Sequence, residues 1–417
     1  MPSSRLTPPV THAARAQASR DGEAFARPST IDPESHVAAD ASIVRVEWLE
    51  SPESIAAIEG EWRDLESRVS ARMAFGSFDY LYPWYCHMPA SQGTPLVGVV
   101  RRAGVMIGLA PLAFRTATLG RVPVKRVDSA GHDGDVGEYL FPADEAASLG
   151  ALFESLFERG GFDVAVLTGV TPGGWVHHAA RGAASRSGRG MDVIRYRYAT
   201  VDLRTGFDGY FEGLSAKLRG NLRRRLKRAE GMGGISLDRI HRPVDQATLS
   251  RYLDRIFQIY ARSWKAKDGE ALQDYHRRFY ADVAERFNAR GTLDLSILQV
   301  GGRDASFILG IRERDAYYDV TISYDEEFAS VSPGTLLIQE VARRIASEGT
   351  RLLVSHGDRE YKRYWASTWV PQKRVAIFSP GLKPALARFA RFEYPRIAHR
   401  IRQLFGHGDP DEGSGQS

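Results

Sequence analysis

Apolar residues recur along the first half of the chain with the spacing of strands and of amphipathic helices. Residues 42–49 alternate as in a strand. Ser51-Pro52 then begins a helix, because serine is favoured at a helix N-cap and proline in the first turn. The same patterns predict strands over 95–100, 105–114, 162–167 and 191–203, a strand and loop over 127–141, and helices over 78–88, 143–159 and 174–184.

The second half repeats a similar order of elements. A basic helix is predicted over 207–230, and Gly231, Gly233 and Gly234 end it. Tight turns at Gly301-Gly302 and Arg314-Asp315 join consecutive strands. Strands are predicted over 235–240, 292–300, 305–312, 316–323, 351–355 and 371–378, and helices over 245–265, 272–290, 332–347 and 382–404. Each half is expected to carry one mixed sheet with helices on both faces, so the fold class is α/β (α+β).

The length of 417 residues exceeds one ordinary core and predicts two domains with loose ends. Residues 1–41 are rich in Ser, Ala, Pro and Arg without periodicity, which predicts a disordered N-terminal tail. The predicted domains span residues 42–205 and 206–380. A basic helix and a loose tail are expected over 381–417.

Composition limits the ligands and the cellular compartment that the sequence predicts. The net charge of +5, from 56 Lys and Arg against 51 Asp and Glu, permits an anionic ligand but gives no strong signal for nucleic acid. One cysteine rules out an internal disulfide, and no apolar run has the length of a membrane span. We therefore expect a soluble, cytoplasmic protein.

A candidate ligand site follows the strand predicted over 316–323. A helix begins there at Ser332-Pro333-Gly334-Thr335, and a helix start carries free N–H groups and a partial positive charge that attract phosphate. Gly334 lets a ligand approach the backbone closely. The alternative is an ordinary helix start, capped by Ser332.

A second polar cluster follows the buried strand over 351–355. It groups His356, Asp358, Tyr361 and Lys362 at a place where open α/β sheets often bind ligands. His356 is a candidate base or pH-sensitive hydrogen-bond donor, and Tyr361 a candidate proton donor to a leaving group. The alternative is a capped turn in which Asp358 and Lys362 form a structural salt bridge.

The basic helix combines an apolar stripe with seven basic residues; the stripe consists of Leu214, Leu218, Leu222 and Leu226. It is either an amphipathic helix with a solvated basic face, or a surface for an anionic substrate, an anionic membrane or RNA. No aromatic residues are interleaved with these cations, which makes nucleic acid the weakest interpretation.

Other catalytic motifs do not occur in the sequence. There is no Gly-x-Ser-x-Gly motif, no Walker loop and no paired cysteine motif. His132 with Asp133 and Asp135 suggests a metal, but no second His or Cys lies at ligand spacing, so no metal site is predicted.

In combination these segments resemble the CelD/BcsL-type acetyltransferases of the GNAT superfamily. The resemblance rests on the basic helix over 217–228, Tyr260 to Trp264, Gly301-Gly302, Tyr324-Asp325 before Ser332-Pro333-Gly334, and Gly357-Asp358 with Tyr361-Lys362 and Trp365. It covers residues 44–378, most securely 214–365. It implies two GNAT-like lobes akin to the FemAB peptidyltransferases, each a mixed, mostly antiparallel sheet flanked by helices.

The resemblance also implies acyl transfer, from acetyl-CoA as co-substrate, to a small-molecule or glycan-precursor acceptor in polysaccharide or cell-envelope biosynthesis. The CoA pyrophosphate position of GNAT folds matches Gly334-Thr335 here, with Ser332 and Lys362 as further donor contacts. The usual Gln/Arg-x-x-Gly-x-Gly/Ala signature is absent, since Ser332-Pro333-Gly334 supplies one glycine. A FemAB-like aminoacyl-tRNA donor, and a non-catalytic role in a cellulose-type exopolysaccharide synthesis system, therefore stay open.

Roles for individual residues follow from this resemblance. Backbone N–H groups near Gly334 and Thr335 would hold the donor and polarise its carbonyl. Asp358, or His356, would take the acceptor's proton, and Tyr361 would protonate the leaving thiolate or ester oxygen. The basic helices would also permit a peripheral membrane contact.

Overall fold

The computed structural model describes residues 44–69, 74–131, 139–267, 272–395 and 397. The predicted N-terminal tail and the end of the predicted C-terminal tail lie outside these residues. The strands are β1 Val44–Leu49, β2 Thr94–Arg102, β3 Val105–Leu119, β4 Val122–Ser129, β5 Val164–Val170, β6 Gly190–Asp202, β7 Ile235–Ile240, β8 Leu293–Val300, β9 Arg303–Glu313, β10 Ala316–Tyr324, β11 Leu352–Ser355 and β12 Thr368–Phe378.

The helices lie close to the predicted ranges. They are α1 Pro52–Ala56, α2 Glu59–Arg68, α3 Phe78–His87, α4 Leu149–Arg159, α5 Trp175–Arg186, α6 Gly206–Gly213, α7 Ala216–Glu230, α8 Gln246–Ala261, α9 Trp264–Lys267, α10 Asp274–Ala289, α11 Pro333–Ser347 and α12 Leu382–Arg388. Shorter helical turns are η2 Ala143–Ser148, η3 Glu326–Val331, η4 Glu360–Tyr364 and the π-helical η5 Phe389–Glu393. None of these described helices combines the length and the hydropathy that a membrane span needs.

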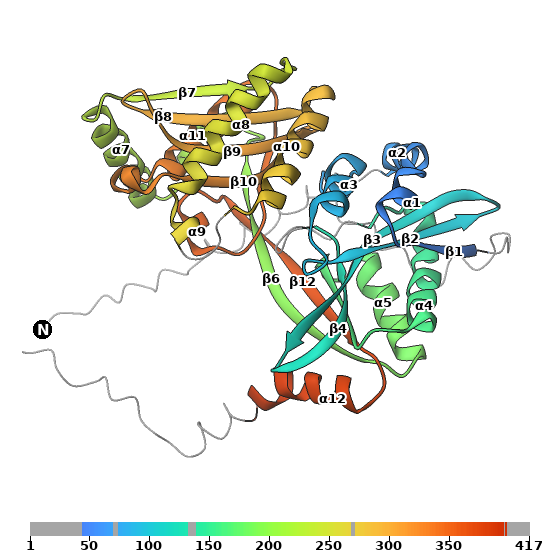
Figure 1. Cartoon of the computed structure of the whole chain (residues 1–417). Helices are drawn as coiled ribbons and strands as arrows, with labels where there is room; N and C mark the ends of the chain where they lie inside the picture. Colours follow the sequence, from blue (N-terminus) through green and yellow to red (C-terminus); the bar gives the residue numbers. More distant parts are fainter. Residues whose placement is uncertain (1–43, 70–73, 132–138, 268–271, 396, 398–417) are drawn as a thin grey trace, which may run out of the picture. The chain divides into compact units, whose positions relative to one another are not determined.

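The described strands form one continuous sheet (Figure 1). Its order is β1-β2-β3-β4-β5-β12-β6-β11-β10-β9-β8-β7. Among these strands, β4 pairs with β5 and β10 with β11 in parallel, and the other pairs are antiparallel. The fold class is therefore confirmed as mixed α/β with a mostly antiparallel sheet flanked by helices. The domain boundaries at 205/206 and 380/381 stay predictions.

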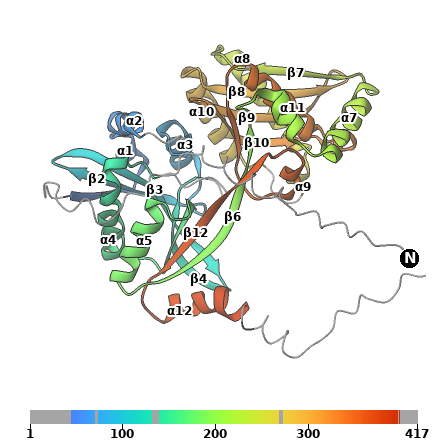
Figure 2. The same cartoon turned by 180° about the vertical axis from the view of Figure 1, so that it is seen from behind.

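The same strand arrangement occurs twice in this sheet. An antiparallel run from β1 to β4 leads to the parallel pair with β5, and an antiparallel run from β7 to β10 leads to the parallel pair with β11. The two arrangements exchange strands at their junction. β12, from the end of the chain, lies between β5 and β6, and it pairs with β6 along its whole length (Figure 2). β6, from the first half, pairs in turn with β11.

Local sequence explains several element boundaries. Ser51 caps α1 as predicted, since its side chain accepts a hydrogen bond from the N–H of Ser54. Gly301-Gly302 forms the predicted hairpin turn, with φ values of 57° and 76° that favour glycine. The helix predicted over 207–230 divides into α6 and α7, because Leu214 is extended and Ser215 caps α7.

Apolar cores lie on both faces of the sheet. Successive residues of a strand point to opposite faces, so Phe307 and Leu309 of β9 join the core that contains α8 and α10. Ile308 between them joins the core that contains α6 and α11. In the first half, α4 and α5 cover a third core. The sheet is thus held between helices on each side.

One of these cores extends from the first half of the chain into the second. Within it, α3 contacts α10, and the rings of Tyr80 and Phe279 lie 5.5 Å apart, centroid to centroid. The buried carboxylate of Asp79 accepts hydrogen bonds from Arg63 at 2.6 Å and from Arg290 at 2.8 Å. Burial alone would raise the pKa of Asp79, but the hydrogen bonds from the two arginines hold it below its usual range.

We expect Asp79→Ala to lower the free energy of unfolding by about 3 kcal/mol, because two guanidinium groups lose their shared buried carboxylate. Urea denaturation followed by circular dichroism measures this change. Since the pKa of Asp79 is lowered by folding, its contribution is present above the unfolded-state pKa and is lost as the pH falls through the folded-state pKa.

The matched control is Asp64→Ala, which removes an exposed carboxylate 3.0 Å from Arg68 on the same helix. Its loss is expected to cost at most about 0.5 kcal/mol, because exposed pairs of this kind contribute little. Equal losses in the two variants would contradict the role assigned to Asp79.

Candidate active site

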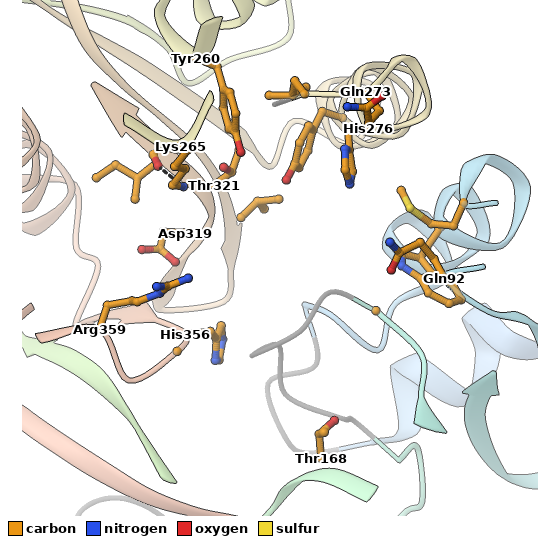
Figure 3. A pocket seen from close by; sticks show the side chains of 18 of the residues that line it. Gln92, Thr168, Tyr260, Lys265, Gln273, His276, Asp319, Thr321, His356 and Arg359 are labelled. Atoms are coloured by element: carbon orange, nitrogen blue, oxygen red, sulfur yellow. Dashed lines mark hydrogen bonds between the residues drawn. The ribbon is translucent and has the colours of Figure 1, made fainter. Parts of the chain in front are cut away.

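A cavity of about 730 Å³ opens between residues of the first and second halves of the chain (Figure 3). This volume suits a small-molecule ligand. The charged side chains among its described lining are six cations and two carboxylates, namely Arg115, Arg126, Lys265, Arg359, Lys362, Arg374, Asp128 and Asp319. The cavity therefore favours a polar or anionic ligand.

The pairing of β10 with β11 ends at Asp319. β10 and β11 pair in parallel as far as Asp319 and Ser355, where β11 ends while β10 continues. A bulge between Asp319 and Thr321 shifts the register with β9 and leaves Val320 without an opposite residue. Bulges redirect side chains and interrupt pairing next to active sites. Asp319 thus lies at the point where strand pairing is interrupted and the cavity begins.

Asp319 is a buried carboxylate in the cavity wall. It accepts hydrogen bonds from the Ser355 hydroxyl and from the backbone N–H of His356. Burial raises the pKa of Asp319, and the positive charges of Lys362 and Lys265 oppose that rise. A carboxylate with a raised pKa is a better base than an exposed aspartate, so Asp319 is suited to take a proton from a bound acceptor.

His356 lies in an aromatic enclosure on the same cavity. Three rings surround it, at centroid distances of 4.7 Å for Phe75, 5.2 Å for Tyr198 and 6.2 Å for Tyr318. Burial and the charge of Lys362 lower its pKa to about 3. Neither ring nitrogen has a hydrogen-bond partner among the described residues. The imidazole is therefore neutral near pH 7 and is a weak base, better suited to hydrogen-bond a ligand.

Tyr361 and Lys362 of η4 also line this cavity. Lys362 is buried, and its ammonium group donates to the carbonyl of His356, which fixes the turn after β11. Tyr361 is 40% exposed, yet desolvation around its hydroxyl and the charge of Asp319 raise its pKa. Tyr361 therefore keeps its proton at neutral pH and is able to donate a hydrogen bond.

Asp358 lies on the surface and is not one of the lining residues. Its carboxylate is 3.3 Å from Nε of Arg197, whose guanidinium lies 4.2 Å from the ring centroid of Trp369. The structure thus brings His356, Tyr361 and Lys362 to one cavity and places Asp358 outside it. The role of Asp358 as a base stays a prediction.

A second cavity, of about 810 Å³, lies between α7 and the start of α11. Ser332 lines it at the N-cap of α11, with a left-handed φ of 51° and no capping hydrogen bond from its side chain. Gly334 and Thr335 follow in the first turn, where the N–H of Thr335 donates to the carbonyl of Ser332 at 3.0 Å. Ser332, Gly334 and Thr335 thus lie together at this helix start, but away from the lining of the first cavity.

The second cavity is strongly basic. Five cations and no carboxylate are found among its described lining residues, the cations being Lys217, Arg224, Arg225, Arg228 and Arg363. Lys217 and Arg225 have no ion-pair partner in the described part of the chain, and burial lowers the pKa of Arg225. Arg228 donates to the carbonyl of Ser330 at 2.7 Å and ties α7 to the segment before α11. Such a cavity at a helix N-terminus suits phosphate groups.

Residues of the short helix η4 line both cavities. Tyr361 and Lys362 line the first, and Arg363 and Tyr364 line the second. Four consecutive residues thus place a basic anion site next to the cavity that holds the buried carboxylate of Asp319.

Asp319 and three arginines of the same cavity, Arg115, Arg126 and Arg374, were not predicted from the sequence. Arg115 and Arg126 share the carboxylate of Asp128, and Nε of Arg374 is buried without a partner among the described residues. These arginines come from β3, β4 and β12, so no local pattern joins them. Asp319 did leave a signal, because an aspartate inside an apolar and aromatic strand is rarely buried unless it is paired or functional.

Within the described residues, no group of three or more His, Cys, Asp and Glu side chains is arranged to hold a metal ion. The segment with His132, Asp133 and Asp135 lies outside them. The nearby Asp128 is held by the two arginines that share it.

We expect His356 to stay neutral well below the usual imidazole range. Its ring-proton NMR shifts, assigned with the His356→Asn variant, should not titrate between about pH 8 and about pH 5. In urea the same ring should titrate at about pH 6.5. Because folding lowers this pKa, only the unfolded chain gains the proton there, and stability falls as the pH drops below about 6.5. A folded-state transition near pH 6.5 would show that the enclosure does not desolvate the ring.

Known proteins share both the site-bearing segment and the fold. Residues 216–363 match the acetyltransferase (GNAT) domain family, over a span that begins with α7 and ends in η4. No curated protein matches the chain. Among solved structures, FemX has a TM-score of 0.52 at 11% identity, over 79% of this chain and 98% of its own.

Two further solved structures are similar to the same extent. L-PGS from Bacillus licheniformis has a TM-score of 0.50 at 11% identity, over 81% of this chain and 96% of its own. A conserved protein of unknown function from Bacteroides thetaiotaomicron has a TM-score of 0.51 at 13% identity, over 80% of this chain and 100% of its own. At such identities the likeness is one of fold alone. Residues 216–363 thus match a GNAT acetyltransferase domain, within a fold that FemX and L-PGS share.

Proposed function

We propose that the protein is an acyltransferase whose donor binds in the basic cavity and whose acceptor binds in the cavity of Asp319. One observation carries this proposal: the span that matches the GNAT acetyltransferase domain contributes to both cavities. α7 and η4 line the basic cavity, while β10 contributes Asp319 to the other. Donor and acceptor would therefore meet at η4.

Acetyl-CoA is the donor that we propose. A CoA thioester carries its phosphates at one end and its acyl group at the other. The phosphates suit the cations of α7, including Lys217 and Arg225, and the start of α11 at Ser332, Gly334 and Thr335 would add its positive dipole end. The thioester would then lie beyond η4, near Asp319, with Lys362 beside it.

The transfer forms a bond between the acceptor's nitrogen or oxygen and the acyl carbon. It breaks the bond from that carbon to the leaving sulfur or oxygen, which takes the electron pair. Asp319 would accept the proton that the attacking atom loses, and its burial favours this uptake. Tyr361 would donate a hydrogen bond to the leaving atom, and neutral His356 would orient the acceptor.

The acceptor would carry an anionic group. Arg115 and Arg126 share one carboxylate, Asp128, and Arg374 lines the same cavity, so these four residues keep a net positive charge. A phosphate or carboxylate of the acceptor would bind there while its nucleophile reaches Asp319. Such an acceptor agrees with the polysaccharide or envelope precursors that the resemblance to CelD/BcsL-type enzymes implies.

An aminoacyl-tRNA is the second candidate donor. The pKa of Tyr361 is raised, which matches an alkoxide leaving group better than a thiolate, since a thiol is a stronger acid than an alcohol. The cations of α7 would bind RNA phosphates as readily as those of CoA. A non-catalytic subunit of an exopolysaccharide synthesis system would keep donor binding without turnover.

We expect Asp319→Asn to lower kcat by at least about 100-fold, because the acceptor loses its base. Thiol release from acetyl-CoA, measured with a panel of amine and hydroxyl acceptors, follows the reaction. The wild-type rate should fall as the pH drops through the raised pKa of Asp319, and the variant should lose this acid limb. Asp358→Asn is the matched control and should change kcat less than about threefold. The opposite ranking would make Asp358 the base.

We expect isothermal titration to detect acetyl-CoA binding, and the double variant Lys217→Gln/Arg225→Gln to weaken it by about tenfold or more, since two phosphate contacts are lost. Added salt should weaken the wild type more than the variant. Arg251→Gln, an exposed change on α8 outside both linings, should bind as the wild type does.

The same titration separates the alternatives. Heat with aminoacyl-tRNA but none with acetyl-CoA would favour the second donor. Donor binding without turnover on any acceptor would favour the non-catalytic role.

A further inference from the structure

The segment from Leu382 to Ile397 carries most of the large apolar side chains that the described residues leave exposed. Elsewhere in the described chain such side chains are scattered singly, at Val105, Met232 and Tyr361. In this segment they are Leu382 at 92% exposure, Leu386 at 57%, Phe389 at 42%, Tyr394 at 59% and Ile397 at 45%. Single exposed apolar residues need no explanation, but a cluster of five marks an interaction surface.

These five side chains lie on one side of a helical segment. Their spacings of four, three and three residues are those of an α-helix face, and the spacing of five falls across the π-helical η5, whose turn is longer. Both views of the molecule show α12 at the end of the sheet, beside β4 and β12, with no labelled element over its outer side (Figures 1 and 2). We call this stripe the outer face.

The opposite side of the segment is firmly docked. Ala387 and Phe392 are buried in a small core against the sheet, and the Phe392 ring lies 6.0 Å from that of Phe378. Lys383 lies 2.7 Å from Asp163, and Arg388 lies 2.6 Å from Asp192.

The β3–β4 turn closes on the segment as well. A Cβ on Gly120 would come within 2.7 Å of the backbone of Arg391. The outer face is therefore presented by an anchored element and does not result from a frayed end.

The segment and the β3–β4 turn packed against it carry positive charge. Arg391 and Arg121, the residue after Gly120, are exposed and have no ion-pair partner among the described residues. Glu393 is the one carboxylate in the described part of the segment. Two copies of this face would bring like charges together, which disfavours self-association. An anionic surface attracts them.

We propose that the outer face docks on an anionic lipid bilayer. Apolar side chains with two aromatic residues among them, bordered by cations, are what an interfacial helix needs to insert its apolar side among lipid headgroups. The cations add attraction to anionic lipids that fades within a Debye length and with salt. The docking does not depend on acyl transfer, so its test needs no acyl donor.

The test is sedimentation of the full chain with vesicles of phosphatidylcholine alone, or of about equal parts phosphatidylcholine and phosphatidylglycerol. The wild type should sediment with the anionic vesicles and remain in solution with the neutral ones. Leu386→Asp/Phe389→Asp should lower the partition coefficient by about tenfold or more, because two inserted side chains become charged. Arg391→Gln should lower it by about threefold or more and reduce its salt dependence.

Val105→Asp is the matched control, since Val105 is 58% exposed at the start of β3. It should partition as the wild type does, and equal melting temperatures would show that all variants fold. No sedimentation of the wild type with anionic vesicles would overturn the proposal, as would an unchanged partition of Leu386→Asp/Phe389→Asp. A wild-type dimer that this double variant converts to a monomer would instead identify a second copy as the occupant.

Discussion

The position of β12 between β5 and β6 is the constraint on which the rest of the structure depends. It joins the end of the chain to the first half, while β6 of the first half joins β11 of the second. Two similar strand arrangements thereby become one sheet. The cavity of Asp319 exists because of this exchange, since its walls combine Asp319 of β10 with Arg126 of β4 and Arg374 of β12. The two halves of the chain also meet through their helices. There α3 contacts α10, and Asp79 pairs with Arg63 and Arg290.

The two cavities differ in the charged residues that line them. The basic cavity has five cations and no carboxylate among its described lining residues, which is a binding environment for phosphates and offers no base. The other cavity holds a buried carboxylate whose pKa is raised by burial, beside a histidine whose pKa the same burial lowers to about 3. Desolvation thus strengthens Asp319 as a base and weakens His356, and this contrast is why we assign proton uptake to the carboxylate.

The fold was largely predictable from the sequence because its signals are local. Ser51-Pro52 and Gly301-Gly302 begin a helix and a turn where their chemistry requires it. The start of β4 was not predicted, because Pro123 disfavours a strand and Arg126 interrupts the alternation that Val122 and Val124 begin. The site was only partly predictable: His356, Tyr361 and Lys362 are neighbours in sequence, whereas Asp319 and Arg374 meet only through strand order. Burial, which sets the pKa of Asp319 and of His356, has no local signature.

The central claim is that donor and acceptor meet at η4 beside Asp319. A crystal structure of the protein with acetyl-CoA tests it most directly. The account predicts phosphates in contact with Lys217 or Arg225 and the thioester carbonyl on the far side of η4, within hydrogen-bonding reach of the groups around Asp319. Phosphates bound instead against Arg126 and Arg374, or a thioester that points away from Asp319, would contradict it.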